Sequence, residues 1–139
     1  MYILDTNVIS ELRRQKPHGA VLAWFDAVKA SEIFVPAVVF SELQAGLGLT
    51  RKHDAAKARE IEIWVNDIEE TAACLQLTSS IARETARLLA DVPNAEYEDA
   101  SIAATALICR MTVVTRNIRD FRNFPVPLIN PFEFRSSPP

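Results

Sequence analysis

Short apolar runs alternate with longer stretches of mixed polarity along this chain. The runs cover residues 2–4, 33–35, 74–77, 112–115 and 126–129. Short apolar segments bounded by polar or turn-forming residues are typical of β-strands, and β-branched side chains favour them. The pattern therefore predicts five short strands. The last is expected at an edge of the sheet, where Pro127 is tolerated.

The stretches between these runs repeat apolar residues at the three- and four-residue spacing of an amphipathic helix. This spacing predicts helices over residues 20–28, 36–47, 51–69, 78–89 and 96–110. Strands that alternate with helices favour a parallel sheet covered on both faces. The expected fold class is therefore α/β, a three-layer α/β/α sandwich with a central, mostly parallel sheet. Ligands of such sheets bind beyond the carboxyl ends of the strands.

The length and composition are those of an ordinary folded domain. With 139 residues, 49% hydrophobic and 24% charged, the chain is expected to form a single domain over residues 1–134 with a disordered tail over 135–139. The sequence has no signal peptide and no apolar run long enough to span a membrane. Cys74 and Cys109 have no metal-ligand spacing and are expected to be buried, which suits a cytoplasmic protein.

The net charge of −3 does not indicate a nucleic-acid partner, because proteins that bind phosphates usually have an excess of basic residues. Divalent cations held by carboxylates would supply the positive charge that a phosphate needs. With three glycines and no Gly-rich loop, the chain excludes phosphate-binding loops and dinucleotide fingerprints. The charge balance leaves a metal-dependent nuclease open.

Asp5 follows the first predicted strand directly, so its carboxylate is expected at the carboxyl edge of the sheet. The cluster Asp5, Thr6 and Asn7 is also typical of a helix start, and Asp5 has a second interpretation as the cap of the next helix. Both interpretations agree on a strand-to-helix junction at this point.

Glu42 and Asp99 lie on apolar faces of predicted helices. Asp99 begins a line of apolar residues in the first turn of its helix, where Glu96 and Glu98 already complement the helix dipole from solvent-facing positions. Glu42 is expected either to enter a cleft or to reach water from the edge of its face. The residues that share a helix face with Glu42 are Val38, Ala45 and Leu49. The small residues that predict close packing of this helix are Ser41, Ala45, Gly46 and Gly48.

A polar loop follows the fourth predicted strand and supplies another acid. It contains Arg116, Asn117, Arg119 and Asp120 after Thr115. Asp120 either joins the candidate site or is a turn residue paired with a neighbouring arginine. Thr6, Asn7, Thr115 and Asn117 are candidates for positioning water or substrate.

Several carboxylates that meet in one pocket repel one another unless a cation neutralises them. Oxygen ligands select hard ions such as Mg²⁺ or Mn²⁺, and these ions serve phosphoryl transfer without a histidine base. His18 and His53 are expected to be solvated, and no serine has a nucleophile motif. The candidates for gripping RNA phosphates are Arg13, Arg14, Arg116 and Arg119, with Lys16 and Arg122 beside them.

Four segments that contain these acids resemble motifs of the PIN-domain family, and more closely those of the VapC and FitB-like toxins of bacteria. They occur in the family's order and at its usual separations, whereas residues 51–95 match by pattern only. The segments read YILDTNVIS from residue 2, PAVVFSEL from residue 36, DASIAATA from residue 99 and TRNIRDF from residue 115.

The resemblance implies a Mg²⁺-dependent endoribonuclease, with Mn²⁺ as the other candidate ion, that acts as the toxin of a type II toxin–antitoxin system. Asp5, Glu42, Asp99 and Asp120 are its implied catalytic and metal-binding set, although the position of the fourth residue leaves Asn117 as an alternative to Asp120. The implied partners are an RNA substrate, a VapB-like antitoxin and a second copy of the chain, with a larger complex on operator DNA.

Two other classes compete with this interpretation. One is a catalytically inactive PIN-like module that binds RNA or a protein partner. The other is a receiver-like switch, which needs an acidic pair before the strand end and a lysine on a late strand, and this chain lacks both. For the homodimer, the sequence offers Trp24, Phe25, Leu47 and Leu49 as apolar contacts.

Overall fold

A five-stranded sheet runs through the middle of the protein in a computed structural model that describes residues 1–137. Its strand order is β3-β2-β1-β4-β5, and every neighbouring pair is parallel. The strands are β1 (Tyr2–Leu4), β2 (Ile33–Pro36), β3 (Ala73–Leu75), β4 (Thr112–Val114) and β5 (Leu128–Ile129). The first strand of the chain is thus the central strand of the sheet.

Seven α-helices occur within the described residues and complete the predicted α/β/α arrangement, which is confirmed. They are α1 (Thr6–Leu12), α2 (Gly19–Ala27), α3 (Ala37–Arg51), α4 (Ala55–Thr71), α5 (Ser79–Asp91), α6 (Tyr97–Cys109) and α7 (Ile118–Phe121). Two 3-10 turns, η1 (Ala30–Glu32) and η2 (Pro131–Glu133), precede β2 and follow β5.

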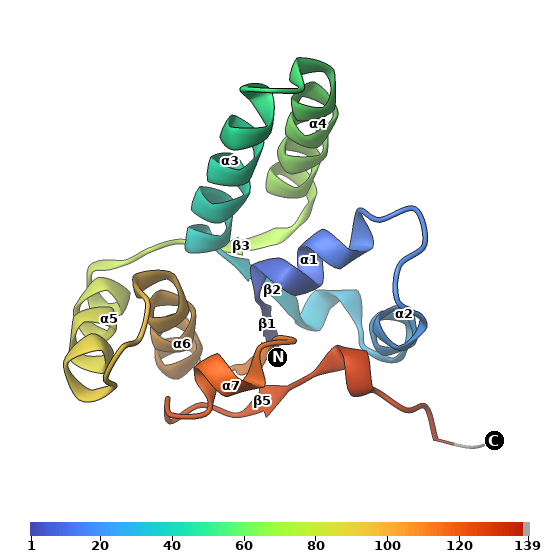
Figure 1. The fold of residues 1–139 in the computed structure, drawn as a ribbon. Helices are drawn as coiled ribbons and strands as arrows, with labels where there is room; N and C mark the ends of the chain where they lie inside the picture. Colours follow the sequence, from blue (N-terminus) through green and yellow to red (C-terminus); the bar gives the residue numbers. More distant parts are fainter. Residues whose placement is uncertain (138–139) are drawn as a thin grey trace.

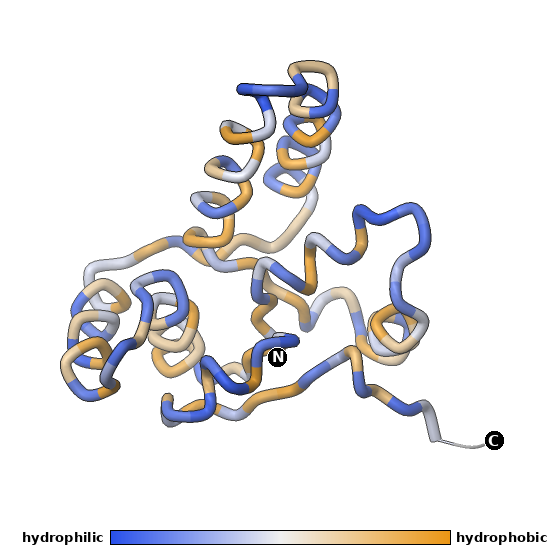
Figure 2. Tube along the Cα trace, in the orientation of Figure 1, coloured by the Kyte–Doolittle hydropathy of each residue, from blue (hydrophilic) through white to orange (hydrophobic). Residues whose placement is uncertain are grey.

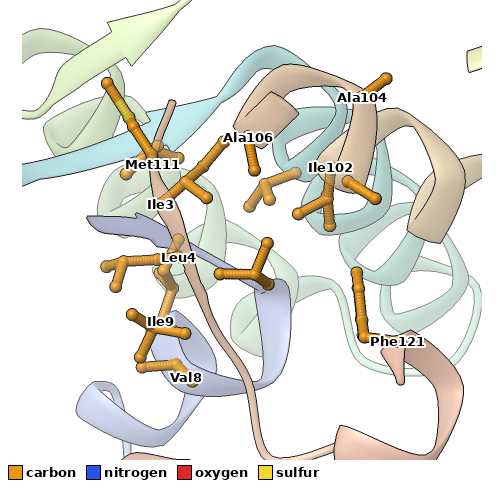
Figure 3. Packing of buried hydrophobic residues seen from close by; sticks show 14 of the residues in the cluster. Ile3, Leu4, Val8, Ile9, Ile102, Ala104, Ala106, Met111 and Phe121 are labelled. Atoms are coloured by element: carbon orange, nitrogen blue, oxygen red, sulfur yellow. The ribbon is translucent and has the colours of Figure 1, made fainter. Parts of the chain in front are cut away.

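The two faces of the sheet bury different helices. On one face Ile3 of β1 lies near Ile102 and Ala106 of α6, and α5 packs behind that helix (Figure 3). On the other face Leu4 lies beside Ile9 of α1. Consecutive residues of a strand point to opposite faces, so the short run Tyr2–Leu4 supplies both cores at once.

Helices α3 and α4 form an antiparallel pair that projects from the end of β2 (Figure 1). Polar residues cover the turn between them and the loop after α1, whereas the central strands are apolar (Figure 2). Among residues 1–137, no helix combines the length and the apolar character needed to cross a membrane.

One helix boundary differs from the sequence expectation. The break between the helices expected over residues 36–47 and 51–69 lies later in the chain, because α3 continues to Arg51 and α4 begins at Ala55. The Asp54 side chain marks the new start, since it accepts a hydrogen bond from the Lys57 backbone N–H at 3.0 Å. An aspartate that caps in this way satisfies a backbone donor that the first helical turn leaves free.

Several expectations about burial were wrong. The apolar pattern predicts a buried side of α5 made of Ile81, Ala82, Thr85, Ala86, Leu88 and Leu89. The structure buries Ile81, Thr85 and Leu88 and leaves Ala82 and Ala86 exposed, because the larger side chains set the orientation of the helix. Cys74 and Cys109 are free thiols that are only partly buried.

The expected tail falls partly outside the described residues. Residues 135–137 form no helix or strand, and residues 138–139 are not described.

Helix α3 also packs differently from the expectation. Its buried line is Val39, Leu43 and Leu47, and Leu49 is exposed. A side chain added at Gly46 or Gly48 would meet nothing within 4 Å, so these glycines are not required by close packing within the chain.

Candidate active site

Asp5 lies at the carboxyl end of the central strand. Its backbone N–H donates to the Val114 carbonyl of β4 at 3.0 Å, which continues the β1–β4 pairing past the last strand residue. The side chain is buried and accepts a hydrogen bond from the Thr6 N–H at 2.7 Å, so Asp5 is also the cap of α1. Asp5 therefore caps α1 and also lies at the carboxyl edge of the sheet, as both interpretations require.

The second carboxylate oxygen of Asp5 is held from the other end of the chain. Its Oδ2 accepts hydrogen bonds from the Thr115 hydroxyl at 2.7 Å and from Asn7 Nδ2 at 2.9 Å. Burial raises the pKa of Asp5, and the hydrogen bonds from Thr115, Thr6 and Asn7 only partly offset this effect. The carboxylate is thus fixed in position while burial still disfavours its charge.

The loop after β4 is tied to this network through its backbone. The Arg116 N–H donates to Asn7 Oδ1 at 3.1 Å, and the Asn117 N–H donates to the Thr115 hydroxyl at 3.0 Å. Asn117 therefore contributes its main chain to the network. Its side chain makes no hydrogen bond to Asp5 in this arrangement.

Glu42 lies on α3, which begins directly after β2 and so starts at the same edge of the sheet. Its Oε1 atom is buried without a hydrogen-bond partner, and so is the hydroxyl of Thr6. Burial raises the pKa of Glu42, and the charges of Asp5, Glu98 and Glu96 add to the shift, while the nearby Thr6 hydroxyl opposes it. The Thr6 hydroxyl thus lies close to this carboxylate without forming a hydrogen bond to it, and a positive group would satisfy the Glu42 oxygen.

Asp99 lies in the first turn of α6 and points to the same place. Burial raises its pKa to about 7, and the charges of Asp5, Asp120, Glu96 and Glu42 contribute to the shift. A carboxyl group with this pKa carries a proton for much of the time near neutral pH. The shift shows that the charged groups of four separate segments are close enough to repel one another.

Asp120 lies on α7 and is more exposed than the other three acids. Together with Asp99 and Arg119 it lines a cavity of about 190 Å³, which Asn94 and Asn123 also border. The negative charge of Asp120 raises the pKa of both Asp5 and Asp99. The charge of Asp120 thus changes the pKa of the buried acids, whereas the Asn117 side chain carries no charge.

The four acids converge without forming a closed ligand set. Among residues 1–137, no three His, Cys, Asp or Glu side chains stand close enough to hold a metal ion directly. Asp99 and Asp120 face the cavity beside α7, whereas Glu42 borders a second cavity beside α1 and α4. The charge of buried Asp5 raises the pKa of Glu42 at one cavity and the pKa of Asp99 at the other.

The arginines predicted from the sequence divide between two places. Arg119 lines the cavity with Asp99, while the guanidinium of Arg116 lies 4.6 Å from the centre of the Phe132 ring. Arg13 and Arg14 line another cavity with residues of the same loop and of α4, and Arg13 also borders the cavity of Glu42. The two arginine pairs therefore flank the acids rather than surround them.

Three features were missed from the sequence. Glu98 is partly buried and, like Glu96, raises the pKa of Glu42, so it does more than face solvent. Lys57 of α4 joins the cavity of Arg13 and Arg14. Glu11 is 6% exposed and accepts the His18 N–H at 2.9 Å, which holds the basic loop. Of these three features, only Glu11 could have been noticed in the sequence, because a charged residue on the buried side of α1 is unusual.

The two histidines take no part in this site. His18 caps α2 by accepting the Ala20 N–H at 3.2 Å and packs against Phe132, and His53 is exposed in the turn after α3. The chemistry that the site offers is therefore that of carboxylates and their hydrogen-bond donors. Carboxylates that are buried together, with raised pKa values and an orphaned oxygen, favour a hard divalent cation.

Comparison with known proteins identifies the family of the chain. The profile of the PIN domain matches residues 2–126. The chain is 34% identical to VapC ribonuclease Y4jK of Sinorhizobium fredii, over 96% of this chain and 99% of that protein. It is 29% identical to Toxin FitB of Neisseria gonorrhoeae, over 95% and 99% of the two chains.

The fold agrees with a solved structure of FitAB bound to the IR36 DNA fragment. The TM-score is 0.78 at 26% identity, and the alignment covers 98% of this chain and 99% of that chain. The match in fold and the match in sequence both extend over nearly the whole length. The chain therefore belongs to the PIN-domain family and resembles its VapC and FitB-like members.

Proposed function

We propose that this protein is a Mg²⁺-dependent endoribonuclease that acts as the toxin of a toxin–antitoxin pair. The observation that carries the proposal is the convergence of Asp5, Glu42, Asp99 and Asp120 at one edge of the sheet, where the charges of Asp5, Glu42 and Asp120 all raise the pKa of Asp99. The relatives named VapC ribonuclease and Toxin FitB support the same activity and role.

The residues of the site fit a Mg²⁺ ion. All candidate ligands are carboxylate oxygens, and Glu42 Oε1 is buried with no partner of its own. Mg²⁺ keeps several of its water molecules and is usually bound by one or two carboxylates, so it does not need three acids in direct contact. Mn²⁺ accepts the same oxygen ligands and is the alternative ion.

A bound ion would supply positive charge to the RNA phosphate and hydroxide from bound water. The protein's own groups then have separate tasks. Thr115, Asn7 and the Thr6 N–H hold the Asp5 carboxylate in one orientation. Asp99, whose pKa is raised to about 7 by burial and by the neighbouring carboxylates, would release its proton when it holds the ion. Asp120 is our choice over Asn117 as the fourth acid, because its charge reaches both Asp5 and Asp99.

The direct test is the cleavage of RNA by the purified protein with Mg²⁺ and with EDTA. We expect internal cleavage with Mg²⁺ and none with EDTA. Asp5→Asn should abolish cleavage, because a neutral amide loses the charge that holds the ion. Asp26→Asn makes the same chemical change on the exposed side of α2 and should leave cleavage intact. EDTA-resistant cleavage would refute the metal role, and complete inertness toward varied RNAs would favour a binding module.

The toxin role predicts an antitoxin that covers the site and suppresses cleavage. Expression of the chain alone should arrest growth of a bacterial host, and expression of Asp5→Asn should not. Normal growth with an active, soluble ribonuclease would contradict the toxin role.

A homodimer remains our expectation for the free protein. Of the apolar contacts expected from the sequence, Trp24 and Leu47 are buried in the core, Phe25 is partly buried and Leu49 is 62% exposed. Leu49 is thus the contact that stays available. Sedimentation equilibrium should give twice the 15.5 kDa chain mass, and a monomer would contradict this expectation.

A further inference from the structure

A second cavity adjoins the acids on the side opposite to α7. It has a volume of about 220 Å³ and lies between α1, α3 and α4. At one end it is bordered by Glu42 and Thr6, whose orphaned oxygens are both buried. The cavity therefore begins at the acids themselves, and none of the roles assigned above explains the rest of its walls.

The far walls of this cavity are apolar and aromatic. Trp64 and Ile61 of α4 form one side, and Leu43 and Leu47 of α3 form another. Trp64 is only partly buried, whereas the other tryptophan of the chain, Trp24, is 2% exposed. A cavity that combines an aromatic face with polar groups at one end suits a nucleoside, because bases stack on aromatic side chains.

The same cavity leads to the basic cluster at the surface. Arg13 borders both cavities, and its guanidinium lies 5.8 Å from the centre of the Trp64 ring. Beyond Arg13 lie Arg14, Lys16 and Lys57, with Glu60 as the one acid of that lining. A path thus runs from the acids past Trp64 to a group of cations that favours phosphates.

We propose that this cavity is a subsite for the nucleotide next to the cut bond of a single-stranded RNA. Its base takes the place of the Arg13 guanidinium over the Trp64 ring, and the following phosphates then lie against Arg13 and the basic cluster. The inference rests on the proposed ribonuclease function and adds the residues that select and position the strand. It favours single-stranded RNA because a base inside a duplex is not free to leave its stack for a cavity.

The first test uses Trp64 as its own reporter. In Asp99→Asn protein, which should leave RNA intact, we expect single-stranded octamers of uridylate or adenylate to quench tryptophan emission. Trp64→Phe in the same background should bind RNA with similar affinity but without quenching. Trp64→Leu keeps the apolar bulk without the aromatic face, and its affinity should fall on the order of tenfold or more. Asn66→Ala, on the exposed side of α4, is the control and should leave quenching and affinity unchanged.

The second test fills the cavity without disturbing the fold. Gly46 borders the cavity and Gly48 does not, although both lie on α3 and an added Cβ atom would meet nothing within 4 Å at either position. Leucine is a better helix former than glycine, so Gly46→Leu and Gly48→Leu should both melt at or above the wild-type temperature. Only Gly46→Leu should lose RNA affinity, again on the order of tenfold or more. A loss shared equally by both variants would contradict the subsite.

The outcomes separate this inference from the proposed function. If the wild type cleaves RNA but no RNA quenches Trp64, the subsite is wrong and the ribonuclease stands. If RNA quenches Trp64 and no cleavage occurs under any metal condition, the subsite stands and the enzymatic proposal fails. Unchanged affinity in both Trp64→Leu and Gly46→Leu would overturn the subsite, whatever the cleavage result.

Discussion

The surroundings of Asp99 disfavour the charged form of its carboxyl group. Its helix is buried through most of its length, and four other carboxylates raise its pKa together with burial. Such a residue lowers the stability of the folded chain in its charged form unless a cation compensates it. A residue that destabilises its own fold in this way is typical of functional sites.

Asp99→Asn should therefore separate stability from activity. Cleavage should fall on the order of 10²-fold or more, because the amide cannot hold the ion. In EDTA the variant should unfold at a higher urea concentration than the wild type, because one repelling charge is removed. Asp91→Asn, on the exposed end of α5, is the control and should change neither measurement. A metal-free Asp99→Asn protein that is less stable than wild type would contradict the repulsion argument.

Thr115 is fully buried and acts on Asp5 through one hydroxyl group. Thr115→Val keeps the shape of the side chain but leaves Asp5 Oδ2 with only the bond from Asn7. We expect a loss of roughly 10- to 100-fold in metal affinity or activity, which is usual when a group that orients a metal ligand is removed. Thr115→Ser retains the hydroxyl and should recover most of the loss. Equal losses in both variants, measured as Mg²⁺-dependent cleavage, would point to packing instead.

At the scale of elements, α6 is the helix that places Asp99. Its residues Ala100 to Ala106 are all buried between the sheet and α5, and Ala100, Ala103 and Ala104 have no exposed surface. Small side chains let this helix approach its neighbours closely, and that distance sets how far Asp99 reaches into the site.

Ala103→Leu should show how little space remains around α6. The larger side chain should lower the free energy of unfolding by about 1 to 3 kcal/mol, because a packed core has no room for it. Cleavage at a temperature where the variant is still folded should also fall, since α6 shifts and carries Asp99 with it. Ala86→Leu on the exposed face of α5 should be nearly neutral in urea denaturation. An equally stable Ala103→Leu protein would show that the packing is looser than described.

The elements themselves were largely predictable, and the exceptions have physical causes. The strand starting at Tyr2 and the helix over residues 97–109 follow from apolar patterns that leave little choice. The break between α3 and α4 was expected too early in the chain, because Asp54 and Lys57 make a local cap that apolar periodicity does not reveal. Ala82 and Ala86 were misplaced because alanine contributes too little apolar area to set a helix orientation.

The residues of the site were predictable to a different extent. Asp5 stood out because it follows a strand, and the topology then brings it to Thr115. The separation of Glu42 and Asp120 into different cavities could not be foreseen, because it depends on side-chain positions. The meeting of Arg13 with Lys57 depends on how α4 packs beside α1, and no local pattern encodes such a contact.

At the scale of the whole molecule, the acids should link stability to pH. Asp99 has a usual pKa of 3.8 that the fold raises to about 7, and the pKa of Asp5 and of Glu42 is also raised. The folded chain thus binds more protons than the unfolded chain between these values. The contribution of the acids to the free energy of unfolding must therefore fall as pH rises through this window.

Thermal melting in EDTA and in Mg²⁺ tests this linkage. The increase in melting temperature caused by Mg²⁺ should be larger at about pH 8 than at about pH 5, because the ion binds ionised carboxylates and releases their protons. In Asp99→Asn protein this increase should be smaller and less dependent on pH. A Mg²⁺ effect that is independent of pH in the wild type would argue against binding at these acids.

The bond between Thr115 and Asp5 joins residues that are 110 positions apart. The central strand β1 is made first, but its neighbour β4 comes near the end of the chain. Nearly the whole chain must therefore be synthesised before the four acids can come together in the folded protein. Under the proposed function, the nascent chain would therefore lack a complete site and could not cleave RNA near the ribosome until translation is almost over.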